Sequence, residues 1–234
     1  MFELIYITVF SLVGLFCIII KGVRENQLSF FQREIMNLSK NLVIIIKAIP
    51  AGLAVLFVFL VRPDDTLFYF IIAGALFFCM LGDLGMEKGL IPGLPLFLLA
   101  QVLFIFGFIL KAIDFEITVN SIILTFLAAG VMIIYIVLLF RYLESSEKGL
   151  GEFKLPVILY ASCISIMLIS TIFLWLTSTN SNTLILILGA LLFVTSDSLI
   201  AIREFHHRFS NDFTIVMGTY YPAILLLSLA AIFV

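Results

Sequence analysis

Two aspartates in apolar stretches of the chain are its first candidates for chemistry. Asp83 lies in "GALFFCMLGDLGM" and Asp197 in "GALLFVTSDSLIAI", where most neighbours are apolar. An ionisable group within a membrane span costs about 2.5–3.5 kcal/mol on insertion scales and usually faces a protein interior or a water-filled cavity. Two carboxylates in such surroundings can perform acid/base catalysis if their environments separate their proton affinities, and they can equally bind ions in a transporter.

Other polar side chains in the apolar stretches are candidate binding residues. The set comprises Lys47, Gln101, Ser196, Tyr220, Tyr221 and Asn41. An aspartate facing the interior needs a partner, and Lys47 is the obvious one. Each candidate also has a purely structural interpretation: Lys47 can extend to the interface, the tyrosines can form an aromatic belt, Ser196 can bond to the preceding turn, Gln101 can join two helices, and Asn41 can cap a helix.

The elements that hold these residues must be membrane-spanning helices. The chain has 234 residues, is 63% hydrophobic and 12% charged, and has a mean hydropathy of +1.27. Soluble domains are about 45–50% apolar and about 25% charged, so the composition indicates an integral membrane protein. A helical span needs about 20 apolar residues, and no stretch shows the alternation of a barrel strand. The sequence therefore predicts an all-α, polytopic helical bundle.

Apolar stretches bounded by charges, Pro or Gly predict eight spans within a single transmembrane domain that covers residues 1–234. The spans are about 3–20, 41–61, 67–86, 93–113, 117–140, 154–176, 183–202 and 213–233. The first stretch begins with Glu3 in place of a basic region and lacks a small-residue cleavage site, so we interpret it as a retained helix.

The distribution of basic residues predicts how the chain crosses the membrane. Ten Lys and Arg residues lie in the connections after the first, third, fifth and seventh predicted helices, against two on the opposite side. The richer side is expected in the cytoplasm, with both termini outside. Lys47, Asp83, Asp197, Tyr220 and Tyr221 then share one depth, roughly 5–12 Å inside the cytoplasmic boundary at about 1.5 Å per residue.

Metal and cofactor motifs are not evident in the sequence. Cys17, Cys79 and Cys163 lie in different apolar stretches, and His206 and His207 are adjacent, with no third histidine to complete a site. A phosphate-binding glycine loop and a Ser/His/Asp set with plausible spacing are also missing. We expect no metal, no cofactor and no nucleic-acid partner. The lipid bilayer is the expected surrounding, and the oligomeric state stays open.

Several segments together resemble one family. The stretch "KAIPAGLA", the pair "FFCMLGDLGM" and "GLPLFLLAQVLFI", and the pair "GALLFVTSDSLIAIREF" and "TYYPAILLLSLA" are similar to the YhhN family of eight-helix membrane proteins, which includes the lysoplasmalogenases. The resemblance extends from about residue 41 to the end of the chain. The ordered pair "GD" and "SDS…TYY" is its most specific part.

The resemblance implies hydrolysis of the vinyl ether bond of lysoplasmalogens, which releases a fatty aldehyde and a glycerophospho-headgroup. The substrate is then a lysophospholipid. Position by position, Lys47 matches the family's lysine in the second helix, Asp83 its "GD" aspartate and Asp197 its "SDS" aspartate, and Tyr220 lies in its "TYY" element. The two aspartates would act as general acid and general base.

Two positions depart from the family pattern. Gln101 stands where many members have His in an "AH" element, and Ile224 stands where a Gln often follows "TYY". A mechanism that requires that histidine for proton transfer therefore does not apply to this chain. Two further hypotheses remain from the residues alone: a transporter of small molecules or lipids that uses the aspartate pair as coupling sites, and a lipid-binding sensor without turnover.

Overall fold

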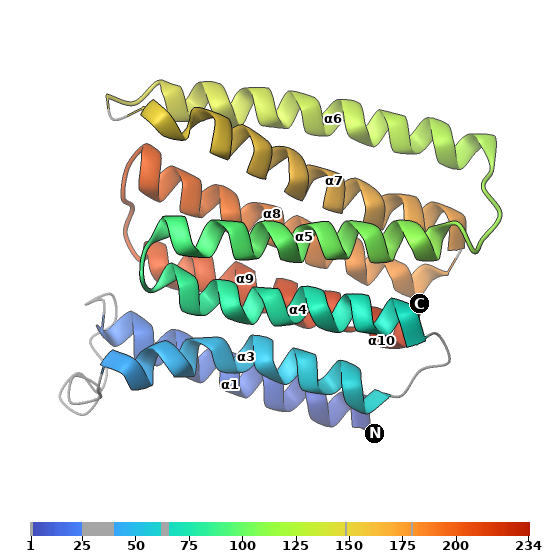
Figure 1. Ribbon diagram of the computed structural model, residues 1–234, viewed down its shortest axis with the longest axis horizontal. Coiled ribbons are helices and arrows are strands. Elements are labelled where there is room, and N and C mark those ends of the chain that lie inside the picture. The colour runs from blue at the N-terminus through green and yellow to red at the C-terminus, as the bar shows by residue number, and fades with distance from the viewer. Residues whose placement is uncertain (1, 25–39, 62–65, 148, 179) are drawn as a thin grey trace.

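Long helices make up almost all of the described chain, and they form one bundle (Figure 1). The computed structural model describes residues 2–24, 40–61, 66–147, 149–178 and 180–234. The helices are α1 (Phe2–Arg24), α3 (Lys40–Val61), α4 (Thr66–Met86), α5 (Leu90–Ala112), α6 (Val119–Glu144), α7 (Lys154–Ser178), α8 (Leu184–Phe205), α9 (Asp212–Ser228) and α10 (Ala230–Phe233), with short 3₁₀ helices at Gly151–Phe153 and Ser181–Thr183.

Eight of these helical segments are long and apolar enough to cross a membrane, so the predicted all-α membrane bundle is confirmed within the described residues. Two helices run further than the predicted apolar stretches. The first stretch was predicted to end at residue 20 and the seventh at residue 202, whereas α1 continues to Arg24 and α8 to Phe205. As a result, Lys21 and Arg203 belong to helices rather than to connections.

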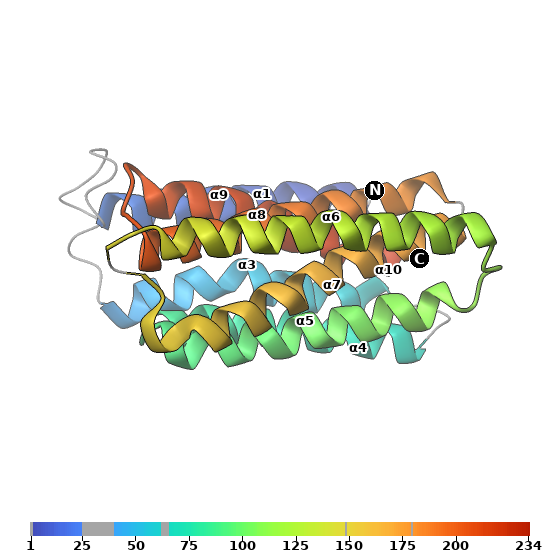
Figure 2. The same cartoon turned by 90° about the horizontal axis from the view of Figure 1, so that it is seen from above.

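The helices lie in two layers, which are seen edge-on in Figure 2. One layer has the order α1, α9, α8 and α6, and the other has the order α3, α4 and α5, with α7 next to α5 and crossing towards α6. In their most apolar windows, 61% of the residues of the α9–α10 segment are buried, against 6% for α6. The C-terminal segment is therefore the centre of the bundle, and α6 presents most of its surface outwards.

The contact between α4 and α5 depends on glycines that allow the backbones to approach closely. A Cβ atom added to Gly85 would lie 2.9 Å from the carbonyl oxygen of Pro92, and one added to Gly93 would lie 2.5 Å from the side chain of Met86. Small residues permit such approaches between membrane helices, where dispersion contacts replace the hydrophobic effect. This packing fixes the end of α4 and therefore the position of Asp83.

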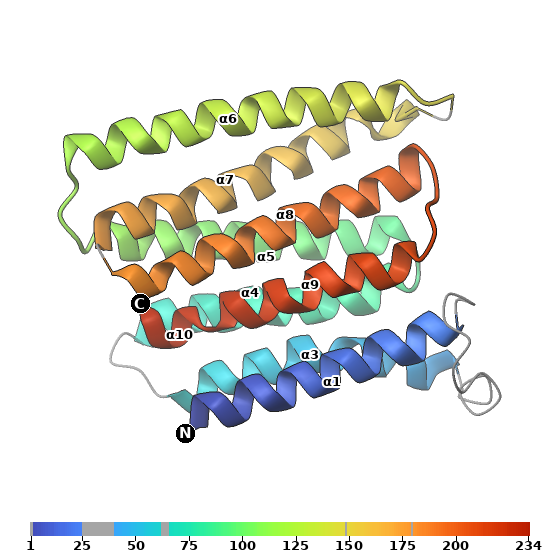
Figure 3. The ribbon, with the colours of Figure 1, turned by 180° about the vertical axis from the view of Figure 1, so that it is seen from behind.

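Both termini lie at one end of the bundle, as Figure 3 shows. The C-terminal ends of α1, α4, α6 and α8 lie at the opposite end (Figure 1). Asp83 is near the end of α4 and Asp197 is two turns before the end of α8, so both carboxylates lie towards the end opposite the termini. This shared position agrees with the depth predicted from the sequence.

Candidate active site

A cavity of about 470 Å³ lies between the two layers, towards the end opposite the termini. Asp83 and Asp197 both contribute to its wall, which is the arrangement predicted from their shared depth. Its other charged lining residues are Lys21, Lys47, Glu87, Arg203, Glu204, Arg208 and Asp212. The cavity is thus a charged compartment inside an otherwise apolar bundle.

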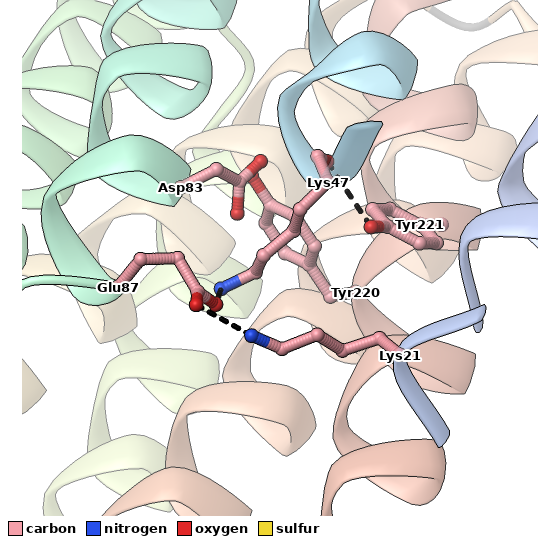
Figure 4. Close-up of polar contacts among 6 residues, drawn as sticks. All are labelled: Lys21, Lys47, Asp83, Glu87, Tyr220 and Tyr221. Carbon is pink, nitrogen blue, oxygen red and sulfur yellow. Dashed lines mark hydrogen bonds and ion pairs between the residues drawn. The ribbon is translucent and has the colours of Figure 1, made fainter. Parts of the chain in front are cut away.

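Asp83 is held at the wall of this cavity by a tyrosine of α9. The Tyr220 hydroxyl donates a hydrogen bond to Oδ2 of Asp83 across 3.0 Å. Asp83 is 1% exposed and Tyr220 is 3% exposed, so this contact belongs to the protein interior (Figure 4). A carboxylate at such a position requires donors of this kind, because an unpaired buried charge is very costly.

Lys47 points towards Glu87, the first residue after α4, rather than forming its ion pair with Asp83. Its Nζ lies 3.3 Å from Oε1 of Glu87, and Nζ of Lys21 lies 2.5 Å from Oε2 of the same carboxylate (Figure 4). The three side chains are 7–12% exposed. The sequence led us to expect an aspartate as the partner of Lys47, and its close ion pair is instead with Glu87, which lies one helical turn beyond Asp83.

This cluster has a clear electrostatic consequence for Glu87, which lies just outside the membrane-spanning segment. Burial alone raises the pKa of the Glu87 carboxyl. The ammonium groups of Lys47 and Lys21 more than offset that effect, so the pKa lies below its ordinary value. Glu87 is therefore the charged link that joins α1 and α3 to the end of α4.

Asp197 has different partners, which are neutral. The Tyr160 hydroxyl of α7 donates to its Oδ2 across 2.6 Å, and Nε2 of Gln101 donates to the same oxygen across 3.4 Å. Both donors act on one carboxyl oxygen. Oδ1 takes no part in these two hydrogen bonds, and Asp197 also lines the cavity.

A comparison with family models decides the relationship of the chain. The model of the YhhN family matches residues 42–231. The chain belongs to the YhhN family. Membership is consistent with a lysoplasmalogenase-like membrane protein. Neither curated proteins nor solved structures gave a match to the chain.

The YhhN match includes both aspartates but not the whole cavity. It begins at residue 42, so α1 lies outside it, and yet α1 contributes Lys21 to the lining. Lys21 is 8% exposed and is fixed by Glu87. This YhhN protein therefore completes its charged compartment with a helix that precedes the matched region.

Three of the sequence-predicted residues, Gln101, Ser196 and Tyr221, do not line the charged cavity. Gln101 is fully buried and contacts Asp197 through its Nε2. The Ser196 hydroxyl donates to the Val216 carbonyl oxygen at 3.2 Å, so it joins α8 to α9. The Tyr221 hydroxyl donates to the Lys47 carbonyl oxygen at 3.1 Å and joins α9 to α3. The side chain of Asn41 lies outside the described part of the structure.

Three residues of the site were missed by the sequence reasoning: Tyr160, Glu87 and Lys21. Tyr160 lies six residues into α7, and Lys47 lies seven residues into α3, so the depth argument applied to every tyrosine would have found it. Glu87 and Lys21 were assigned to connections because they are close to the ends of apolar stretches. No simple signal in one sequence shows that both turn into the interior.

The described residues contain no group of three or more His, Cys, Asp or Glu side chains arranged to hold a metal ion. His206 instead stacks on Tyr142, with ring centroids 4.3 Å apart, and its Nδ1 lies 2.7 Å from Nδ1 of His207. Within the described part of the chain, the polar groups at the cavity are carboxyl, hydroxyl, amino, guanidinium and amide groups.

Proposed function

We propose that this YhhN protein is a membrane-embedded hydrolase that cleaves the vinyl ether bond of lysoplasmalogens or of a related lysolipid ether. The products are a fatty aldehyde and a glycerophospho-headgroup. The observation that carries the proposal is the shared cavity of Asp83 and Asp197, two carboxylates from different layers of the bundle. Family membership supports the same reaction class.

The reaction requires two proton-transfer groups. A vinyl ether is hydrolysed by protonation of an alkene carbon, which gives an oxocarbenium ion, and water then attacks the carbon bonded to oxygen. A general acid and a general base on either side of one substrate satisfy this sequence, as the paired carboxylates of glycosidases do for a similar cation. Hydrolysis is redox-neutral, so the proposed reaction needs no cofactor.

The charged lining suits a polar headgroup. In the proposal, the ammonium groups of Lys21 and Lys47 and the guanidinium groups of Arg203 and Arg208 face the phosphate-bearing part of the lipid. In the proposal, this end of the bundle faces the cytoplasm, as the positive-inside distribution of the sequence supports, and the headgroup enters from the cytoplasmic leaflet.

The test is an aldehyde-release assay with purified protein in detergent and a lysoplasmalogen. Wild-type protein is expected to release aldehyde, whereas Asp83→Asn and Asp197→Asn are expected to release at least about 100-fold less, the usual contribution of a general acid or base. Asp114→Asn is the matched control, because the Asp114 side chain is 57% exposed and lies outside the cavity.

The proposal is overturned if wild type releases no more aldehyde than the two aspartate variants across several headgroups. Uptake of lipid or of a small solute by proteoliposomes would then favour the transporter hypothesis, with Asp83 and Asp197 as coupling sites. Binding without turnover or uptake would favour the sensor hypothesis.

A further inference from the structure

A second cavity, smaller and almost entirely apolar, lies beside the charged one. It has a volume of about 60 Å³ and is formed by residues of α5, α6, α7 and α8 together with Met86 at the end of α4. Two of its polar groups, the hydroxyls of Tyr135 and Ser198, contact each other, and Ser198 also donates to the Val194 carbonyl oxygen at 2.6 Å. We call this second cavity the apolar groove. Apart from Asp197, its lining offers little to a polar ligand.

The apolar groove and the charged cavity meet at a few shared residues. Met86, Phe97, Asp197 and Ile200 contribute to both linings. Asp83 contributes only to the charged cavity. Asp197 is therefore the carboxyl group at the junction, and Asp83 lies wholly on the polar side.

We infer that the apolar groove holds the first part of the aliphatic chain of the lipid substrate, next to the scissile bond at Asp197, with the headgroup in the charged cavity. The inference rests on the proposed function and adds the direction in which the substrate lies, from its chain in the groove to its headgroup in the charged cavity. Continuity of the two compartments supports this occupant, because a molecule with one apolar chain and one charged end matches both. A chain in the bilayer is already out of water, so the groove contributes orientation more than affinity.

The direction of the substrate assigns the two carboxyl groups. The alkene carbon on the chain side lies towards the groove, and the carbon bonded to oxygen lies towards the charged cavity. The Asp197 carboxyl therefore gives its proton to the chain-side carbon, and the alkene electron pair forms the new C–H bond. Water adds to the oxocarbenium carbon and loses a proton to the Asp83 carboxylate.

The remaining steps restore the enzyme and balance the reaction. The hemiacetal loses the glycerol oxygen, which takes up the hydroxyl proton, and the aldehyde forms. The proton on Asp83 returns to Asp197 through the water of the charged cavity, which both residues line. One water is consumed for each ether bond that is broken.

Filling the groove tests the inference by kinetics. Ala161→Leu and Ala201→Leu each add an aliphatic side chain to the groove lining. We expect kcat/KM for a long-chain lysoplasmalogen to fall by about tenfold or more, as when a hydrophobic pocket is altered by a few methylene groups, while a short-chain analogue loses much less. Gly130→Leu is the control, because a Cβ at this exposed α6 position meets nothing within 4 Å.

Equal losses for both chain lengths would overturn the groove assignment and leave the hydrolase proposal intact. A second measurement needs no turnover. A lysophospholipid that carries a photoreactive group on its chain, close to the glycerol end, is cross-linked to the protein in nanodiscs, and the cross-linked peptides are identified by mass spectrometry. Cross-links concentrated on the groove residues of α7 and α8 and lost in Ala161→Leu support the inference. Cross-links spread evenly over the outward faces of the helices contradict it, whether or not the protein hydrolyses the lipid.

Discussion

The two aspartates lie on walls of the same cavity but have surroundings of different kinds. Asp83 accepts a hydrogen bond from Tyr220, and the cluster of Lys47, Glu87 and Lys21 lies on its side of the cavity. Asp197 contacts two neutral donors. Asp83 thus has the charged cluster of α1, α3 and the end of α4 on its side of the cavity, whereas the direct hydrogen-bond donors to Asp197 are neutral side chains of α5 and α7.

This difference in surroundings explains how one site can contain a general acid and a general base of the same residue type. Two carboxyl groups take different roles when their surroundings treat their charged forms differently. A fixed cation stabilises a carboxylate, whereas neutral donors and an apolar groove do so less. The contrast agrees with the direction inferred for the substrate, in which Asp197 gives the proton and Asp83 receives one from water.

The largest expected effect comes from removing either carboxyl group, and the pH profile distinguishes them. Asp83→Asn and Asp197→Asn are each expected to reduce kcat by about 10²–10⁴-fold. A general base must be ionised, so Asp83→Asn removes the fall in residual rate at low pH. A general acid must be protonated, so Asp197→Asn removes the fall at high pH. The measurement is kcat/KM of each variant against pH.

The fall in rate at low pH is the low-pH limb of the profile, and the fall at high pH is the high-pH limb. If Asp83→Asn removed the high-pH limb and Asp197→Asn the low-pH limb, the inferred direction of the substrate would be contradicted, although both residues would remain catalytic. Equal profiles for both variants would mean that the carboxyl groups titrate as a coupled pair with no separate roles. Asp114→Asn should keep the full wild-type profile, since its side chain is largely exposed and far from the cavity lining.

A smaller effect is expected when one hydrogen bond to each carboxyl group is removed. Tyr160→Phe takes the 2.6 Å donor from Asp197, and Tyr220→Phe takes the 3.0 Å donor from Asp83. Each is expected to lower kcat by about tenfold, because a hydrogen bond to a charged group contributes about 1.5–3 kcal/mol and part of it is replaced by water. KM is expected to change little.

The two tyrosine variants form a matched pair, and their pH profiles test whether they act as positioning residues. Tyr160→Phe should move the high-pH limb and leave the low-pH limb in place, and Tyr220→Phe should do the opposite. A uniform loss of rate with neither limb moved would indicate that the tyrosines only support the packing of the helices. Thermal unfolding of both variants in detergent provides the check on packing.

Much of the fold follows from the sequence because a bilayer restricts the possible structures. Apolar stretches of about 20 residues must form helices, and their alternation across the membrane places Asp83 and Asp197 near the same end. Depth is therefore predictable from counting residues. The side to which each helix turns is not, since it depends on packing such as the close approach at Gly85 and Gly93.

In the candidate site, too, the depth of a residue is predictable from the sequence and the direction of its side chain is not. Asp83, Asp197 and Tyr220 were predicted and line the charged cavity, since each is polar at the shared depth. Tyr221 has that depth too, but its hydroxyl turns to the backbone of Lys47. Tyr160 was missed because a lone tyrosine in an apolar helix resembles packing. Rotation about the helix axis separates these cases, and one sequence does not determine it.

The smallest expected effect concerns the charged cluster, and it is an effect on stability. Glu87→Gln leaves the ammonium groups of Lys21 and Lys47 without their shared carboxylate and is expected to destabilise the protein by about 2 kcal/mol at neutral pH. Glu144→Gln breaks the pair with Lys154, whose side chain is 54% exposed, and is expected to cost less than about 1 kcal/mol. Thermal unfolding in detergent measures both.

Acidification should remove the difference between wild type and Glu87→Gln. The pKa of Glu87 is depressed in the folded protein, from an ordinary value of 4.5, by Lys47 and Lys21 acting against the effect of burial. The stabilisation is therefore complete above the unfolded value and is lost as the pH falls below 4.5 through the folded value. If the two unfolding temperatures differ equally at neutral and at strongly acidic pH, Glu87 stabilises α1 and α3 by packing and not by charge.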